Sequence, residues 1–195
     1  VVKKLNETNY QNLATEETID IYFGEASFKN DRELIVRAGE ERFSLKGALV
    51  FINTGSESRI PNIRGIMESK HVYDSTQLQE LPILPKRLGI IGAGNIGLEF
   101  ASIYSGFGSK VTLIETGAEI LKHEEPEIRI AVQEELVQQG IEVLTETAVS
   151  SIQDVTNDGV KVITKAGDTF NFDAILIATG RKPAIESLRL WNTAI

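Results

Sequence analysis

A glycine-rich turn between an apolar run and a helix-like run is the part of the chain whose residues could do chemistry. Gly92, Gly94 and Gly97 form a G-x-G-x-x-G pattern, and Glu115 follows 18 residues after the third glycine. The first glycine of such a pattern permits a tight turn, the second lets a pyrophosphate approach the backbone, and the third lets the helix pack against the strand. The helix N-terminus offers unpaired N–H groups to an anion, so the turn predicts a dinucleotide site.

Glu115 is the residue expected to choose between the two pyridine nucleotides. A carboxylate at the end of the second strand accepts hydrogen bonds from the adenosine ribose hydroxyls and repels a 2′-phosphate. The next arginine, Arg129, is predicted well inside the second helix. The pattern therefore favours NAD(H) over NADP(H). The alternative is that the turn only packs and that Glu115 ends a solvated strand.

Strands and helices alternate around the glycine turn. The sequence predicts strands at 87–91, 110–114 and 141–144, and helices from 95 to 104 and from 126 to about 140. This alternation is typical of a parallel sheet. The second helix is expected to carry Ile128, Val132 and Leu136 inward.

The same order of elements occurs twice, on either side of this α/β unit. Each copy has a meander of short strands, followed by a continuously apolar run and then by Thr-Gly. The first copy ends at Gly55 and the second at Gly180. The first copy is expected to have strands at 19–23, 34–36, 41–45 and 48–52, and the second at 149–155, 160–164, 169–172 and 174–178. The two apolar runs predict strands buried on both faces of a sheet. A tight turn is expected at Asn157-Asp158-Gly159. We interpret the repetition as an internal duplication.

The composition limits the classes of partner and site. A net charge of -8 repels nucleic acid and anionic membrane surfaces, and no apolar run is long enough to span a bilayer. The absence of cysteine excludes disulfides and thiolate metal sites within these 195 residues. His71 and His123 lack the partners of a metal site and are expected in a linker and on the surface. No secretory signal is recognisable, so a cytoplasmic location is expected.

Three segments together resemble a known family. They are INTGSESRIP at 52–61, GAGNIGLEFA at 92–101 and ILIATGRKP at 175–183. They resemble the flavoprotein pyridine nucleotide-disulfide oxidoreductases, which include lipoamide dehydrogenase, glutathione reductase and mercuric reductase, and the similarity covers essentially the whole chain.

The resemblance implies an internal fragment of a class I enzyme with an α/β fold. It implies a Rossmann-like NAD-binding domain with a parallel sheet and an antiparallel β-meander, plus part of a duplicated FAD-binding domain. The implied boundaries are a partial FAD-binding domain at 1–70, the NAD-binding domain at 71–185, and the start of the return to the FAD domain at 186–195.

The resemblance also implies roles for residues at matching positions. Glu99 resembles the acid that faces the nicotinamide and the flavin, and it is the one expected catalytic residue. NAD contacts are implied for Gly92, Gly94, Asn95, Ile96, Gly97, Glu115, Gly180 and Val149, the last lying against the adenine. FAD-side contacts are implied for Gly24, Ala26, Thr54, Gly55 and Ser56.

Two positions depart from the family pattern. Asn95 stands where the family often has a tyrosine that covers the flavin until nicotinamide enters, which puts that gate in doubt. Ala184 replaces the asparagine that commonly follows G-R-x-P. The redox-active cysteine pair and the first FAD glycine loop belong to a part of the family's sequence that this chain does not include.

In the intact protein the resemblance implies hydride transfer from NADH to FAD and onward to a disulfide, a metal ion or another small acceptor, in a homodimer. The fragment alone is expected to be inactive. Two alternatives remain open. One is a thiol-independent NADH:flavin oxidoreductase, such as an NADH oxidase or a ferredoxin-reductase-like enzyme, and the other is a non-catalytic dinucleotide-binding module.

Overall fold

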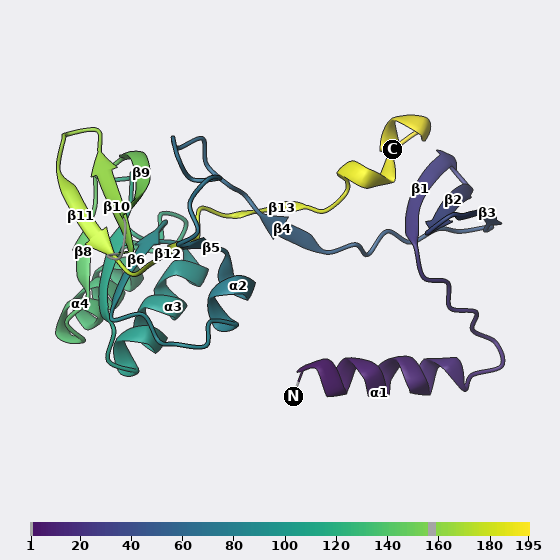
Figure 1. Cartoon of the computed structure of the whole chain (residues 1–195), viewed down its shortest axis with the longest axis horizontal. Coiled ribbons are helices and arrows are strands. Elements are labelled where there is room, and N and C mark those ends of the chain that lie inside the picture. The colour runs from purple at the N-terminus through teal and green to yellow at the C-terminus, as the bar shows by residue number, and fades with distance from the viewer. Residues whose placement is uncertain (1, 156–158) are drawn as a thin grey trace. The chain divides into compact units, whose positions relative to one another are not determined.

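The computed structural model describes residues 2–155 and 159–195, and the chain divides into two compact units. The larger unit is Ser56–Lys182, and the smaller unit contains the residues up to Gly55 together with Pro183–Ile195 (Figure 1). Asn157 and Asp158 of the expected tight turn lie outside the described residues. The α/β unit with the glycine turn falls entirely within the larger unit.

A five-stranded parallel sheet forms the centre of the larger unit, in the order β5-β12-β6-β7-β8. Its strands are β5 (Val72–Tyr73), β6 (Arg87–Ile91), β7 (Lys110–Ile114), β8 (Glu142–Leu144) and β12 (Ala174–Ile177). The predicted parallel sheet is confirmed. Because β12 and β7 flank β6 on opposite sides, the strand order reverses at β6, which is where open α/β sheets bind ligands.

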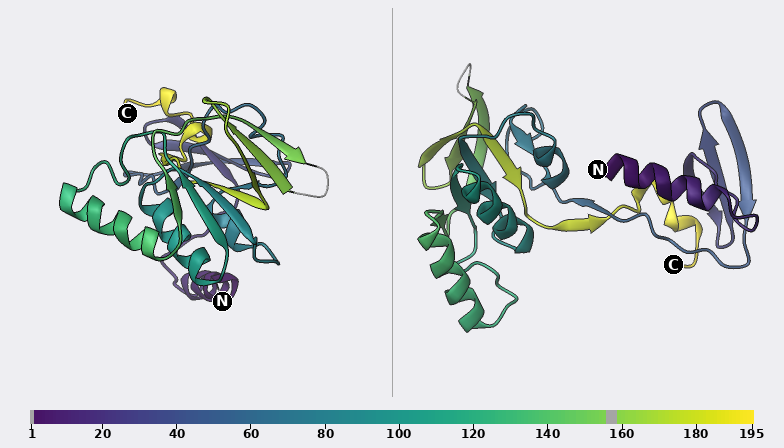
Figure 2. Two further views of the ribbon diagram at one scale, coloured as in Figure 1. Left: turned by 90° about the vertical axis from the view of Figure 1, so that its left-hand side faces the viewer. Right: turned by 90° about the horizontal axis from the view of Figure 1, so that it is seen from below.

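The two faces of this sheet are covered by different elements (Figure 2). Helices α2 (Ser75–Gln79), α3 (Asn95–Gly106) and α4 (Pro126–Gln138) lie on one face, and the antiparallel strands β9 (Val149–Val155), β10 (Gly159–Thr164) and β11 (Thr169–Phe172) lie on the other. Ile90 and Leu176 are fully buried on the helical side, whereas Ile175 is fully buried on the meander side. The sheet is therefore the middle of three layers.

Helix α4 differs from its expected packing. Leu136 is buried and Val132 is partly buried, but Ile128 is 51% exposed. The helix contacts the edge strand β8, so only its second half reaches the core. The prediction that Ile128 points inward is wrong for this reason.

The smaller unit contains α1 (Val2–Ala14) and a three-stranded antiparallel meander. The meander strands are β1 (Glu25–Asn30), β2 (Glu33–Ala38) and β3 (Glu41–Lys46). Two short 3-10 turns, Glu186–Leu188 and Leu190–Asn192, pack against β1. The side chain of Asn192 donates to the carbonyl of Phe28 at 2.7 Å, which fastens this segment to the meander.

Two predicted strands of the first copy do not form. Residues 19–23 and 48–52 have no regular secondary structure, and Phe51 is 85% exposed. A strand needs a hydrogen-bonded neighbour on at least one side, and no strand of the described residues pairs with either segment.

None of the helices in the described residues has the length and apolar character needed to cross a membrane.

Two further strands, β4 (Ser56–Ser58) and β13 (Arg181–Pro183), form a two-stranded sheet of their own. They stand where the chain leaves one unit for the other, between Gly55 and Ser56 and between Lys182 and Pro183. The two crossing points are therefore held next to each other by backbone pairing.

Candidate functional site

The glycine turn joins β6 to α3 at the reversal point of the sheet. Gly92 has a φ of +108°, and a Cβ there would lie 2.5 Å from the carbonyl oxygen of Ala178. A Cβ on Gly97 would lie 2.1 Å from the carbonyl oxygen of Gly92. Neither position accepts a side chain, because the turn packs tightly against the end of β12 and the first turn of the helix packs on the glycine turn itself.

Gly94 has a different reason for being glycine. Nothing lies within 4 Å of the place where its Cβ would stand, so the protein itself leaves this space open. Gly94 is also the N-cap of α3 and carries no side chain that could satisfy the first N–H groups of the helix. Asn95 and Ile96 follow at the start of the helix, so the open space faces backbone donors and the positive end of a helix dipole.

Glu115 follows β7, and its carboxylate accepts hydrogen bonds from two backbone N–H groups. Its Oε2 accepts a hydrogen bond from the N–H of Ala93 at 2.8 Å, and its Oε1 accepts one from the N–H of Gly117 at 2.7 Å. The carboxylate is partly buried. A carboxylate has about four lone-pair positions, so each oxygen can still accept a further hydrogen bond from a ligand hydroxyl.

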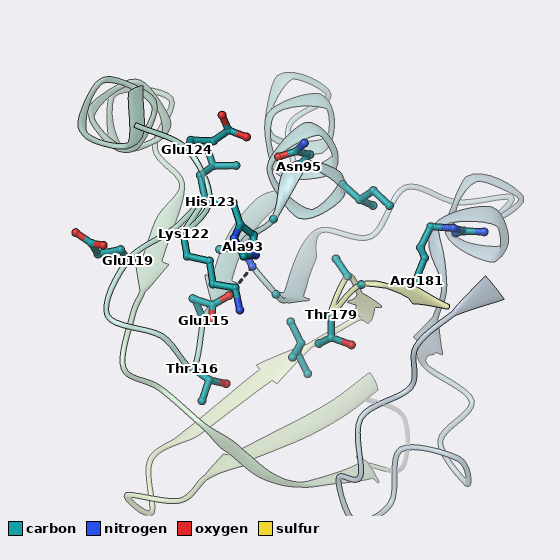
Figure 3. A pocket seen from close by; sticks show the side chains of 17 residues that line it. Ala93, Asn95, Glu115, Thr116, Glu119, Lys122, His123, Glu124, Thr179 and Arg181 are labelled. Atoms are coloured by element: carbon teal, nitrogen blue, oxygen red, sulfur yellow. Dashed lines mark hydrogen bonds between the residues drawn. The ribbon is translucent and has the colours of Figure 1, made fainter. Parts of the chain in front are cut away.

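These features open into one cavity of about 730 Å³ (Figure 3). The wall includes the glycine turn with Asn95 and Ile96, Glu115, and the segment 178–181 that follows β12. The loop before α4 also lines the wall, with Glu119, Leu121, Lys122, His123 and Glu124. The N–H of Leu121 donates to the carbonyl of Ala93 at 3.0 Å, so this loop is attached to the glycine turn.

The cavity carries charges of both signs. Lys122, His123 and Arg181 contribute basic side chains, and Glu115, Glu119 and Glu124 contribute carboxylates. Glu119 forms an ion pair with Arg129 of α4. His123 is exposed, as the sequence predicted, but it also stands on the cavity wall.

Several predicted site residues lie outside this wall. Val149 is only 9% exposed and packs in the core between the sheet and the meander. Glu99 is exposed on α3. Among the positions expected on the FAD side, Gly24, Ala26, Thr54 and Gly55 belong to the smaller unit, and Ser56 begins β4 of the larger unit.

Sequence reasoning missed the loop 119–124 and the residues Thr179 and Arg181. A signal existed for Thr179 and Arg181, since ligands bind beyond the carboxyl ends of parallel strands and both residues follow β12. The loop offered no comparable signal because it has no periodic pattern.

Four described groups have shifted pKa values, and none of the four lines the cavity. They are Glu33, Tyr104, Asp154 and Asp173. Burial raises the pKa of the Tyr104 hydroxyl, which donates to the carbonyl of Leu78. For Asp154, burial opposes ionisation, but hydrogen bonds from Lys70 and Ser69 outweigh it and lower the pKa. These groups support the fold, whereas the cavity offers hydrogen bonds and charges for binding.

Comparison with known proteins identifies the family. The family described as "Pyridine nucleotide-disulphide oxidoreductase" matches residues 1–194. The chain belongs to this family. Its members are FAD flavoproteins that use NAD(P)H, and they include oxidoreductases such as dihydrolipoyl dehydrogenase. The resemblance inferred from the three sequence segments is thereby confirmed.

Individual members of the pyridine nucleotide-disulphide oxidoreductases match along the whole chain. It is 40% identical over 195 residues to the probable pyridine nucleotide-disulfide oxidoreductase RclA of Escherichia coli, covering 44% of that protein. It is 32% identical over 192 residues to a mercuric reductase of Lysinibacillus sphaericus, covering 97% of this chain and 34% of the relative. The chain thus spans less than half the length of these relatives.

Among solved structures, a Cu(II) complex of the flavoprotein disulfide reductase RclA from Escherichia coli has a TM-score of 0.94 at 39% identity. The similarity extends over all of this chain and over 44% of the RclA chain. The fold class expected from the sequence is confirmed by this similarity.

The residues of the cavity fit a pyridine dinucleotide. The open space at Gly94, the start of α3 and the carboxylate of Glu115 line one cavity large enough for an extended ligand. The positions expected on the FAD side are distributed over both units. The members of the family are FAD flavoproteins, and FAD supplies the redox chemistry when it is bound.

Proposed function

We propose that the larger unit binds NADH in this cavity. The adenosine ribose lies at Glu115 and the pyrophosphate lies over Gly94 at the start of α3. One observation carries the proposal: the carboxylate of Glu115 and the uncapped N-terminus of α3 open into the same cavity. The remaining lone pairs of Glu115 accept the ribose hydroxyls, and the first N–H groups of α3 donate to the phosphates.

The carboxylate of Glu115 supports a preference for NADH over NADPH. A 2′-phosphate on the ribose would stand beside the carboxylate of Glu115, and the two negative charges would repel each other. Arg129 is paired with Glu119 and is not available to offset this repulsion without breaking that ion pair.

In the full-length protein, NADH bound here delivers a hydride to FAD, and the electrons pass on to a disulfide, a metal ion or a similar small acceptor. Relatives named mercuric reductase and flavoprotein disulfide reductase support this range of acceptors. Glu99 is the proposed catalytic acid at the nicotinamide, and Val149 is the proposed adenine contact. Gly180 completes the NAD contacts.

The proposed domain assignment follows the same reasoning. Residues 1–70 contribute Gly24, Ala26 and the segment Thr54-Gly55-Ser56 to an FAD-binding domain, 71–185 bind NAD, and 186–195 return to the FAD domain. We also propose a cytoplasmic homodimer that does not bind nucleic acid, in keeping with the net charge of -8.

The nucleotide preference is tested by calorimetric titration of the chain with NADH and with NADPH. Changing Glu115→Gln removes the charge but keeps one carbonyl acceptor. We expect the affinity for NADH to fall about tenfold and the ratio of NADH affinity to NADPH affinity to decrease. Glu124→Gln removes the same charge elsewhere on the cavity wall and serves as the control. Equal effects of the two substitutions, or no binding of NADH by the unchanged protein, would contradict the proposal.

The position of the pyrophosphate is tested by Gly94→Ala. The new methyl group enters open space, so the folded protein tolerates it, but it occupies the place proposed for the phosphates. We expect an unchanged melting temperature and about tenfold weaker NADH binding. Gly106→Ala is the matched control, because Gly106 ends the same helix and its Cβ would also meet nothing within 4 Å.

A further inference from the structure

His123 is a residue of the cavity wall whose part in the site has not been assigned. It lies in the loop 119–124 before α4, and Figure 3 draws its ring on the inner side of this loop, beside Ala93 of the glycine turn. Imidazole is the side chain whose ordinary pKa lies between about pH 5 and about pH 8. A ligand in this cavity therefore meets either a neutral ring or a cation, depending on the pH.

The loop holds His123 at a defined place relative to the glycine turn. Ile120 is buried at 1% exposure, and the N–H of Leu121 donates to the carbonyl of Ala93 at 3.0 Å. The N–H of Glu124 donates to the carbonyl of Leu121 at 2.8 Å, which closes a turn with His123 inside it. The backbone that carries the imidazole is thus fastened to the segment that contains Gly94, where the diphosphate is proposed to lie.

Charged groups of both signs share the cavity wall with His123. They are Lys122, Glu119 and Glu124 of the same loop, Glu115 after β7 and Arg181 after β12. Arg129 of α4 pairs with Glu119, and the start of α3 adds the positive end of a helix dipole. Carboxyl groups ordinarily titrate well below neutral pH, and ammonium and guanidinium groups well above it. Among the described residues that line the cavity, His123 therefore has the one type of side chain that ordinarily titrates near neutral pH.

We propose that protonation of His123 controls how tightly this cavity binds NADH, so that binding of the dinucleotide is coupled to uptake of a proton by the imidazole. The inference rests on the proposed binding of NADH in this cavity. The diphosphate of NADH stays negatively charged near neutral pH, and an imidazolium ring attracts it more strongly than a neutral ring does. By linkage, bound NADH favours the protonated ring, and its affinity rises as the pH falls. Because His123 is exposed, water and salt screen the attraction and keep the effect moderate.

Calorimetric titration with NADH at several pH values tests this coupling. For the unchanged chain we expect about fivefold tighter binding at about pH 6 than at about pH 8. His123→Gln removes the titrating ring and should bind NADH at every pH with the weaker affinity. His71→Gln removes the other histidine of the chain, which bonds to the carbonyl of Asp173 and does not line the cavity. This matched control should keep the pH dependence of the unchanged chain.

Two further measurements separate the charge of the ring from its shape. His123→Lys carries a fixed positive charge, so it should bind NADH at about pH 8 as tightly as the unchanged chain does at about pH 6. Titrations in PIPES and in ACES near neutral pH detect the proton, because the two buffers release different heats when they give one up. The binding enthalpy should differ between the buffers for the unchanged chain and for His71→Gln, but not for His123→Gln. Melting curves verify that the variants fold, and His123→Lys carries the test if His123→Gln does not.

Different failures point to different claims. If NADH binds equally well at all pH values, or if the pH dependence persists in His123→Gln or His123→Lys, the imidazole does not control binding. The inference is then overturned while the proposed function stands. If His71→Gln abolishes the pH dependence, the proton is taken up outside the cavity, and the inference is also overturned. If the unchanged chain does not bind NADH at any pH, the proposed function itself fails, and this inference fails with it.

Discussion

The two continuously apolar runs, ALVFI at 48–52 and AILI at 174–177, have similar sequences and opposite environments. Both are followed within a few residues by Thr-Gly. The second is strand β12, and its four residues are buried. The first has no regular secondary structure, and Leu49 is 77% exposed whereas Leu176 is fully buried.

The difference between the two runs lies in their neighbours. β12 pairs with β5 on one side and β6 on the other, with helices and the β9–β11 meander covering its two faces. No strand among the described residues pairs with 48–52. An apolar run therefore indicates that a segment is suited to burial, but whether it forms a strand depends on the presence of partner strands.

The largest effect expected from this comparison is in the free energy of unfolding. Leu176→Ala should lower it by about 2–5 kcal/mol, because it leaves a cavity in a closely packed core. Leu49→Ala makes the same chemical change in the exposed run and should alter it by less than about 0.5 kcal/mol. Urea unfolding followed by circular dichroism measures both. A loss at Leu49 as large as that at Leu176 would show that the first run is packed in solution.

The second effect concerns the ion pair at the start of β12. The carboxylate of Asp173 accepts hydrogen bonds from the backbone N–H of Arg87 at 2.8 Å and from its guanidinium Nη2 at 2.7 Å. Burial opposes ionisation of Asp173, but the bonds from Arg87 outweigh it, so the pKa of this carboxyl is lowered. Asp173→Asn should cost about 1–2 kcal/mol at neutral pH.

The pH dependence of this effect has a defined sign. Because the pKa of Asp173 is lowered on folding, its contribution is complete above the ordinary carboxyl pKa of about 4 and is lost as the pH falls through the folded-state value. The difference between Asp173→Asn and the unchanged protein should therefore shrink on acidification. Asp20→Asn makes the same chemical change at an exposed carboxylate in the first copy, should leave the free energy of unfolding at neutral pH almost unchanged, and is the control.

The smallest effect is expected in the meander of the smaller unit. Lys29 pairs with Glu33 across the β1–β2 turn at 2.8 Å, and this hydrogen bond lowers the pKa of Glu33. Lys29→Ala should raise that pKa toward its ordinary value while leaving the unfolding transition almost unchanged, because exposed ion pairs add little stability. An NMR titration of Glu33 measures the change. A large loss of stability would mean that this surface pair supports the meander more than the partly buried Asp173 pair supports β12.

The larger unit could be predicted closely from the sequence. The sequence predicts the correct bounds for four strands, at 87–91, 110–114, 149–155 and 169–172. In each of them, residues that favour turns lie next to the apolar or alternating pattern and mark where the strand ends. Gly92 and Gly97 could also be predicted as positions without space for a side chain, since the fingerprint spacing fixes the strand–turn–helix geometry.

Features that depend on distant residues could not be predicted. The exposure of Phe51 depends on which strands are beside it, and the exposure of Ile128 depends on α4 lying at the edge of the sheet. The loop 119–124 joins the cavity through the hydrogen bond from Leu121 to Ala93, which no periodic pattern marks. Arg181 is positioned by Ser56, 125 residues earlier in the chain.

Amide hydrogen exchange of the chain, with and without saturating NADH, tests whether the dinucleotide binds at the start of α3 and at Glu115. We expect slower exchange in the presence of NADH at the start of α3, in 115–124 and at 179–181, and unchanged exchange in β1–β3 of the smaller unit. Protection confined to the smaller unit, or no protection at the start of α3 despite measurable binding, would contradict it.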